Sequence, residues 1–261
     1  EKIQLLGTFE TVRFKNETDS NKGLEGLVNK NFYDLFESIT EDKNILIPKN
    51  RLFITKGVRD SNHKIIPGTK SIPDALLITL DQDNVKLPIR INLIEYECYG
   101  ENKTGEAQKK AYLGQVILKQ LMKFASTFSV TTDYQLRQTT IENWISKIMN
   151  YINSNETLNN KINTWVKTLN PLIKESGIDR YFEQELKKAF RFNLQIILII
   201  DEMTVEDKKF IERVINSYPL EQPVWTIKPN SIQFKCYVVK LQQVFKVFNP
   251  SENYALTLQE F

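Results

Sequence analysis

Residues 72–80 read Ile-Pro-Asp-Ala-Leu-Leu-Ile-Thr-Leu, and residues 89–97 read Ile-Arg-Ile-Asn-Leu-Ile-Glu-Tyr-Glu. Both stretches are apolar runs of strand length, and residues 81–84, Asp-Gln-Asp-Asn, form a good turn sequence between them. We therefore expect two adjacent strands. An aspartate opens the first strand, and two acids separated by one residue end the second.

The acids at these strand ends predict a divalent-metal site. Successive side chains of a strand point to opposite faces, so Glu95 and Glu97 project the same way. Apolar residues at alternate positions before them anchor that face in the core: Ile89, Ile91 and Leu93. If Asp74 lies beside the glutamates, three carboxylates converge, and a hard cation such as Mg²⁺ makes that clustering tolerable. The alternative is that these are strand-end acids facing solvent, with Asp74 capping its strand.

Composition and length are those of a folded protein with room for one large domain or a domain with an insertion. The chain has 261 residues, of which 41% are hydrophobic, and this is enough for a packed core. No apolar run approaches the ~20 residues that span a bilayer, so we expect no membrane partner. Cys98 and Cys236 form no disulfide framework, which favours a cytoplasmic location. The net charge of +3 permits nucleic-acid binding without indicating it.

Apolar periodicity predicts the other elements. Helical spacing predicts helices over residues 24–39, 106–128 and 206–218, and a wholly helical stretch from 131 to 189. Apolar or alternating runs predict strands over residues 51–55, 194–200 and 231–247, with a polar, basic loop over 56–71. The order of these elements predicts an α/β fold with a mixed central β-sheet and a helical insertion.

Pro73-Asp74, an apolar strand, a turn and a second strand ending in Glu95-Tyr96-Glu97 resemble the motif of the PD-(D/E)XK nucleases, the fold of many restriction enzymes. The resemblance implies a three-layer restriction-endonuclease-like core that hydrolyses phosphodiester bonds with Mg²⁺ or Mn²⁺, with Asp74 and Glu95 as metal ligands. The family usually has lysine where this chain has Glu97. Glu97 is then the general base or a further ligand, and Lys103 and Lys109 are the nearest lysines able to reach in.

Two further matches extend the resemblance. Glu25 lies in the predicted first helix, where such folds carry a glutamate that faces the metal site. Gln108 and Tyr112 match the Gln-xxx-Tyr pattern of RecB-like nucleases, in which residues four apart on one helix face hold a DNA phosphate. Lys109 and Lys70 are further candidates for DNA contacts.

The resemblance also predicts how the chain is divided. Residues 1–130 would form the nuclease core with the metal site, 131–190 a helical insertion subdomain, and 191–261 the strands and helix that complete the core. The resulting hypothesis is a DNA endonuclease of restriction or defence type, with dimerisation allowing both DNA strands to be cut. The alternatives are a DNA-binding module that keeps the fold without hydrolysis, and a RecB-like exonuclease or repair nuclease.

Three other sequence patterns give weaker indications of function. Residues 194–202 read like the strand and acid that hold nucleotide-bound Mg²⁺, but the chain has no phosphate loop upstream, so we expect no nucleotide cofactor. His63 is the only histidine, so Ser-His-Asp catalysis and His-ligated zinc lack their parts. Basic and aromatic residues in and after the helical stretch either grip a DNA backbone or form an ordinary solvated face: Lys161, Trp165, Lys167, Lys174, Lys187, Lys188, Arg191 and Phe192.

Overall fold

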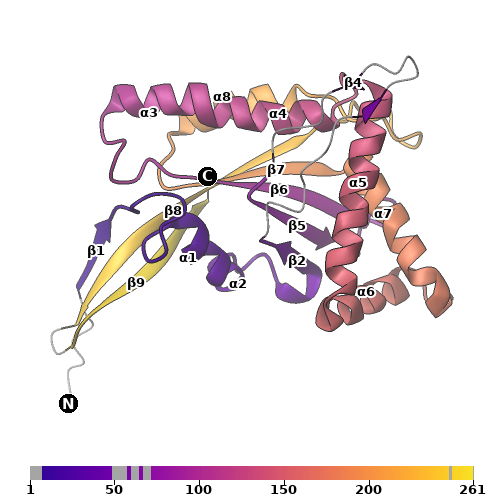
Figure 1. The fold of residues 1–261 in the computed structure, drawn as a ribbon, viewed down its shortest axis with the longest axis horizontal. Helices are drawn as coiled ribbons and strands as arrows, with labels where there is room; N and C mark the ends of the chain where they lie inside the picture. The colour runs from indigo at the N-terminus through magenta and orange to yellow at the C-terminus, as the bar shows by residue number, and fades with distance from the viewer. Residues whose placement is uncertain (1–7, 49–57, 60–64, 67–71, 247–248, 261) are drawn as a thin grey trace.

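A mixed, strongly curled seven-strand sheet forms the centre of the protein (Figure 1). The computed structural model describes residues 8–48, 58–59, 65–66, 72–246 and 249–260. The predicted α/β class with a mixed sheet is confirmed. No helix in these ranges is both long and apolar enough to cross a membrane.

The strand order along the sheet is β1-β8-β7-β6-β5-β2, with β9 on the other edge of β8. The bounds are β1 (Thr8–Val12), β2 (Asn44–Ile47), β5 (Ala75–Leu80), β6 (Ile89–Glu97), β7 (Leu194–Ile200), β8 (Gln233–Lys246) and β9 (Asn249–Glu260). Strands β6, β7 and β8 are parallel, and all other pairs are antiparallel. A separate two-stranded ladder joins β3 (Val58–Arg59) and β4 (Ile65–Ile66).

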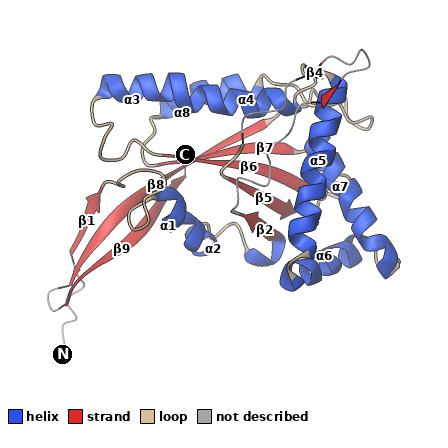
Figure 2. Cartoon of the chain, in the orientation of Figure 1, coloured by secondary structure: helices blue, strands red, loops and turns tan. Residues whose placement is uncertain are grey.

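Helices cover both faces of the sheet (Figure 2). One face carries α3 (Glu106–Tyr112), a π-helical segment (Leu113–Ile117), α4 (Leu118–Phe128), α5 (Tyr134–Asn153), α6 (Glu156–Leu169), α7 (Ile178–Phe192) and α8 (Val205–Asn216). The other face carries α1 (Leu24–Lys30) and α2 (Phe32–Leu35). Short 3₁₀ turns span Glu41–Lys43 and Glu175–Gly177.

The alternation of strand β6 decides which residues belong to which core. Ile91 and Leu93 pack into the cluster under α4–α8, whereas Ile94 and Tyr96 pack into the cluster under α1 and α2. The residues of both clusters are almost fully buried, and the one buried polar side chain before the end of β6, Asn92, donates to the Leu77 carbonyl and the Thr79 hydroxyl. The sheet is therefore rigid where its last side chains become polar.

Most predicted elements are confirmed. The strand over residues 194–200 is β7, and the helical stretch between β6 and β7 contains α5, α6 and α7. The single helix over 24–39 is wrong, because the chain leaves helical geometry at Asn31, which separates α1 from α2. Strands β1, β2 and β9 were not predicted, and the predicted strand at 51–55 lies outside the described residues. The domain boundaries at 130 and 190 stay a prediction.

Candidate active site

The predicted acids of β5 and β6 lie at the same end of two paired strands. Ala75 pairs with Ile94, so the register sets Asp74 opposite Glu95. The backbone N–H of Tyr96 donates to Asp74 Oδ2 at 2.9 Å and fixes the aspartate against the neighbouring strand. Two of the three predicted carboxylates are therefore brought together by strand register alone.

Glu95 and Glu97 project toward the helices α3 and α4, as the alternation predicts. Gln120 Nε2 donates to Glu95 Oε1, and the Tyr112 hydroxyl donates to Glu97 Oε2. Glu95 is 2% exposed and Glu97 5% exposed. The alternative that these glutamates face solvent is therefore wrong. Ionised carboxylates are rarely buried this deeply without a strong compensating charge.

The pKa values of these carboxyls reflect burial and mutual repulsion. Burial and, to a smaller extent, the charges of Glu25, Glu97 and Glu17 raise the pKa of Asp74 to about 7, against the opposing effect of the hydrogen bond from the Tyr96 N–H. Burial also raises the pKa of Glu97 to about 7, although the Tyr112 hydrogen bond and Lys103 oppose the rise. Burial and the nearby charges of Asp74, Glu97 and Glu25 raise the pKa of Glu95 well above its ordinary value. Predicted Glu25 is half-buried in the first turn of α1, with its own pKa raised by burial.

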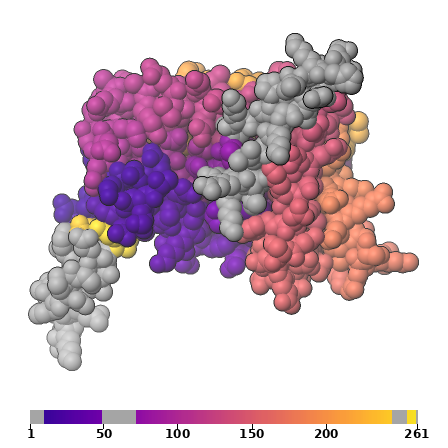
Figure 3. Space-filling model, viewed as in Figure 1, coloured from indigo at the N-terminus to yellow at the C-terminus, as the bar shows by residue number. Residues whose placement is uncertain are grey.

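Glu17 is an additional acid that the sequence pattern did not reveal. Glu17 Oε1 accepts the Cys98 N–H at 3.3 Å and the Tyr112 hydroxyl at 3.2 Å, so it joins the end of β6 to α3. Tight Asx turns hold its loop, because Asn16 and Asp19 side chains accept nearby backbone N–H groups. These turns were the only sequence signal that residues 13–23 adopt a fixed shape. Figure 3 shows the N-terminal segment (indigo) packed beneath the α3–α4 region (magenta).

The two lysine candidates have different surroundings. Lys103 Nζ donates to the Cys98 carbonyl at 2.9 Å, lies 3.9 Å from the Tyr112 ring centroid, and forms a 3.5 Å ion pair with Glu17. Lys109 instead pairs with Glu202 at 2.6 Å. Lys103 is therefore the predicted lysine that belongs to the acidic end of β6.

The Gln-xxx-Tyr pair does not present one phosphate-binding face. Gln108 Oε1 accepts the Gly105 N–H at 3.4 Å at the start of α3, while the Tyr112 hydroxyl points inward to Glu97. The predicted contact residue Lys70 and the sole histidine, His63, lie outside the described residues. The joint role expected of Gln108 and Tyr112 therefore stays a prediction.

The acid after β7 anchors a loop. Asp201 accepts the backbone N–H groups of Tyr99 and Gly100, each at 2.9 Å. Gly100 has a φ of +58°, and a Cβ added there would lie 2.9 Å from the Lys15 carbonyl oxygen. Asp201 thus fixes the turn that follows β6 and, through it, the position of Lys103.

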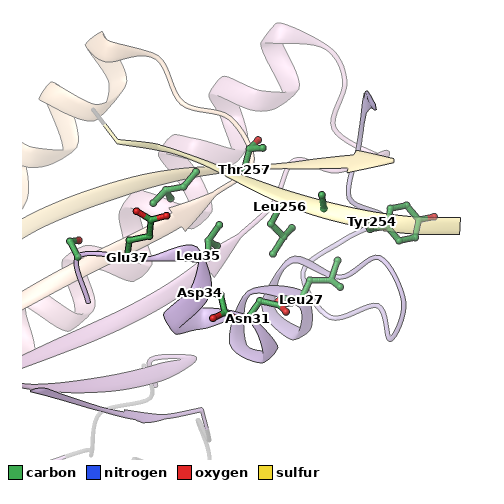
Figure 4. A pocket seen from close by; sticks show the side chains of 11 residues that line it. Leu27, Asn31, Asp34, Leu35, Glu37, Tyr254, Leu256 and Thr257 are labelled. Atoms are coloured by element: carbon green, nitrogen blue, oxygen red, sulfur yellow. The ribbon is translucent and has the colours of Figure 1, made fainter. Parts of the chain in front are cut away.

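A cavity of about 800 Å³ lies between β9 and the helices α1 and α2, and neither Asp74, Glu95 nor Glu97 lines it. Figure 4 shows its walls, with Leu27 of α1, Asn31 and Leu35 of α2 on one side and Tyr254 and Leu256 of β9 on the other. None of the predicted site residues lines it. The predicted site residues and this cavity are therefore separate features.

The acidic cluster comprises Glu17, Glu25, Asp74, Glu95 and Glu97. Glu95 Oε2 is buried without a hydrogen-bond partner among the described residues, so a hard oxygen ligand remains unused there. Over the same part of the chain, no group of three or more His, Cys, Asp or Glu side chains is arranged to hold a metal ion. Asp74, Glu95 and Glu97 are each held by a neutral donor instead. Carboxylate oxygens are suitable ligands for Mg²⁺ or Mn²⁺. Cation binding would require these side chains to turn away from the groups that now donate hydrogen bonds to them.

Comparisons with protein-family models, with curated protein sequences and with solved structures find no match.

Proposed function

We propose that this protein is a Mg²⁺- or Mn²⁺-dependent DNA endonuclease of restriction or defence type, built on a restriction-endonuclease-like core. The observation that carries the proposal is the placement of half-buried Asp74 and buried Glu95 and Glu97 together at the ends of two paired strands, where their charges repel. A divalent cation offsets such repulsion.

Asp74 and Glu95 are the proposed metal ligands, with Glu25 as a further ligand from α1. A bound divalent cation supplies the polarisation of a phosphoryl oxygen and an attacking water with a lowered pKa. The protein contributes rigidity, because Asp74 is fixed by a backbone N–H and Glu95 lies on a strand packed on both faces. Gln120, which now donates to Glu95, holds this carboxylate toward the α4 side.

Glu97 and Lys103 share the role that the family gives to one lysine. We assign proton acceptance from the attacking water to Glu97, because its position follows the ligand Glu95 on the same face of β6. Lys103 lies close enough to stabilise the ionised form of Glu97. The variants Glu97→Gln and Lys103→Met separate these roles. Loss of cleavage in the first with partial activity in the second supports the assignment, and the reverse contradicts it.

A second candidate is a nucleic-acid-binding module that does not hydrolyse DNA. The lack of a preformed three-residue metal group within the described ranges favours it, as does the engagement of Lys103 with Glu17. The RecB-like alternative has less support, because Gln108 and Tyr112 point to different partners.

Plasmid cleavage with Mg²⁺ or Mn²⁺ decides between these functions. Cutting that disappears in Asp74→Asn and Glu95→Gln but persists in Asp83→Asn, an exposed acid of the β5–β6 turn, supports the endonuclease. DNA binding without cutting of supercoiled, linear or methylated substrates favours the binding module. Progressive shortening of linear DNA from its ends favours an exonuclease.

A further inference from the structure

A crevice opens where two strands succeed each other along one edge of β8. Strand β7 pairs with β8 as far as Val238, and β1 pairs with it from Leu241 onward. The intervening residues have no strand neighbour on that side, and a cavity of about 220 Å³ lies there. The crevice is at the carboxyl ends of the parallel strands β6 and β7, where open α/β sheets commonly bind ligands.

The charges around the crevice favour an anion. Its cationic lining residues are Arg13 and Lys240. None of the ion pairs between described residues includes either side chain. Its acids are already satisfied, because Asp201 accepts two backbone N–H groups and Glu202 pairs with Lys109 at 2.6 Å. The positive charge of Arg13 and Lys240 therefore remains available to a ligand.

The size and position of the crevice favour a phosphate group. Its volume is below the roughly 300–1,000 Å³ of pockets for drug-sized ligands, so a phosphate fits better than a whole nucleotide. Tyr99 lines the crevice, and its ring lies 6.1 Å from that of Tyr112, whose hydroxyl donates to Glu97. One aromatic pair thus separates the crevice from the acidic cluster.

We propose that this crevice binds a backbone phosphate of the nucleic-acid strand held at the acidic cluster, with Arg13 and Lys240 as its ligands. The inference rests on the proposed function for the identity of the ligand. A phosphate contact carries no sequence information, so the crevice positions the strand without reading it. Arg13 also donates to the Gly100 carbonyl at 3.4 Å, which couples the crevice to the turn after β6.

The salt dependence of DNA binding tests the proposal without requiring cleavage. Fluorescence anisotropy of a labelled DNA duplex in EDTA gives the slope of log K against log [salt] for the wild type and for Arg13→Ala/Lys240→Ala. Losing one phosphate contact lowers the magnitude of the slope by about 0.9, equivalent to about tenfold weaker binding at 0.1 M salt. The charge-retaining variant Arg13→Lys/Lys240→Arg should keep the slope.

The matched control is Lys86→Ala/Lys228→Ala, which removes the same charge from loops that precede β6 and β8, at the other end of these strands. Equal slopes for wild type and the crevice variant, equal losses in both double variants, or no DNA binding by the wild type would overturn the proposal. So would thermal protection of the wild type by inorganic phosphate, lost in the crevice variant while the DNA slope is unchanged. Thermal melting of each variant verifies folding.

Failure of the proposed function gives a different result. If the crevice variant shows the expected smaller salt slope but the wild type does not cut DNA with metal, the phosphate site is supported and the nuclease function is contradicted. If the wild type cuts DNA but the crevice variant has an unchanged salt slope, the nuclease function is supported and the phosphate site is contradicted.

Discussion

Replacing Asp74 with asparagine is expected to stabilise the metal-free protein at pH 8 and to leave it nearly unchanged at pH 4. Asparagine keeps an oxygen that accepts the Tyr96 N–H, and it removes a charge that is buried among Glu25, Glu97 and Glu17. The pKa of Asp74 is raised from 3.8 to about 7 by burial and by these neighbours. The native state therefore binds a proton that the unfolded chain releases between pH 4 and 7.

The sign follows from proton linkage. Where the native state binds more protons than the unfolded state, stability falls as pH rises. The wild type should lose stability from about pH 4 to about pH 7 and then level off. Each pKa unit corresponds to about 1.4 kcal/mol, so ionised Asp74 lowers the free energy of unfolding by roughly 4 kcal/mol above pH 7. Glu97, whose pKa is also about 7, adds to the same fall.

Urea unfolding in EDTA at intervals from pH 4.5 to 8.5 measures this effect. Asp74→Asn should flatten the dependence, whereas Asp83→Asn should run parallel to the wild type. A wild-type stability that rises between pH 5 and 7, or an asparagine variant no more stable than wild type at pH 8, would contradict a raised pKa of Asp74 in the native state.

Three further substitutions test the residues that hold the candidate site in place. Gly100→Ala should destabilise the protein by about 1–3 kcal/mol in urea unfolding, because φ is +58° and the new methyl group meets the Lys15 carbonyl. Asp201→Ala should lower the melting temperature, with a loss of about 2–3 kcal/mol, since two backbone N–H groups after β6 lose their acceptor; hydrogen exchange should accelerate there. Tyr112→Phe removes a donor that lowers the pKa of Glu97, so metal-free stability should fall by about 1–2 kcal/mol at pH 8 and by less at pH 5. Unchanged unfolding curves would contradict each expectation.

The acids of the candidate site were predictable because strands impose strict geometry. A period of two sets Glu95 and Glu97 on one face, and an aspartate before the preceding strand is carried opposite Glu95 by the turn between them. Strand β7 was predictable because five of its seven residues, Ile196 to Ile200, form an unbroken apolar run, which fits a buried central strand.

The remaining features depend on contacts between segments far apart in the chain. Glu17 lies in a loop, and only its approach to Cys98, 81 residues away in sequence, brings it to the site. The helix predicted across Asn31 breaks there, and the Asn31 side chain donates to the Leu27 carbonyl at 2.8 Å. Periodicity cannot reveal such local competition between a side chain and the helix backbone. The pairing of Lys109 with Glu202 rather than Glu97 likewise depends on how β7 and α3 meet.

Calorimetric titration of the metal-free protein with Mn²⁺ at pH 7.5 measures whether the acidic cluster binds a divalent cation. We expect saturable binding that releases protons, because carboxyls with raised pKa values must ionise to become ligands. Binding should be lost in Asp74→Asn and in Glu95→Gln and retained in Asp83→Asn. No saturable binding by the wild type, or equal binding by all four proteins, would contradict the assignment of a divalent-cation site to the acidic cluster.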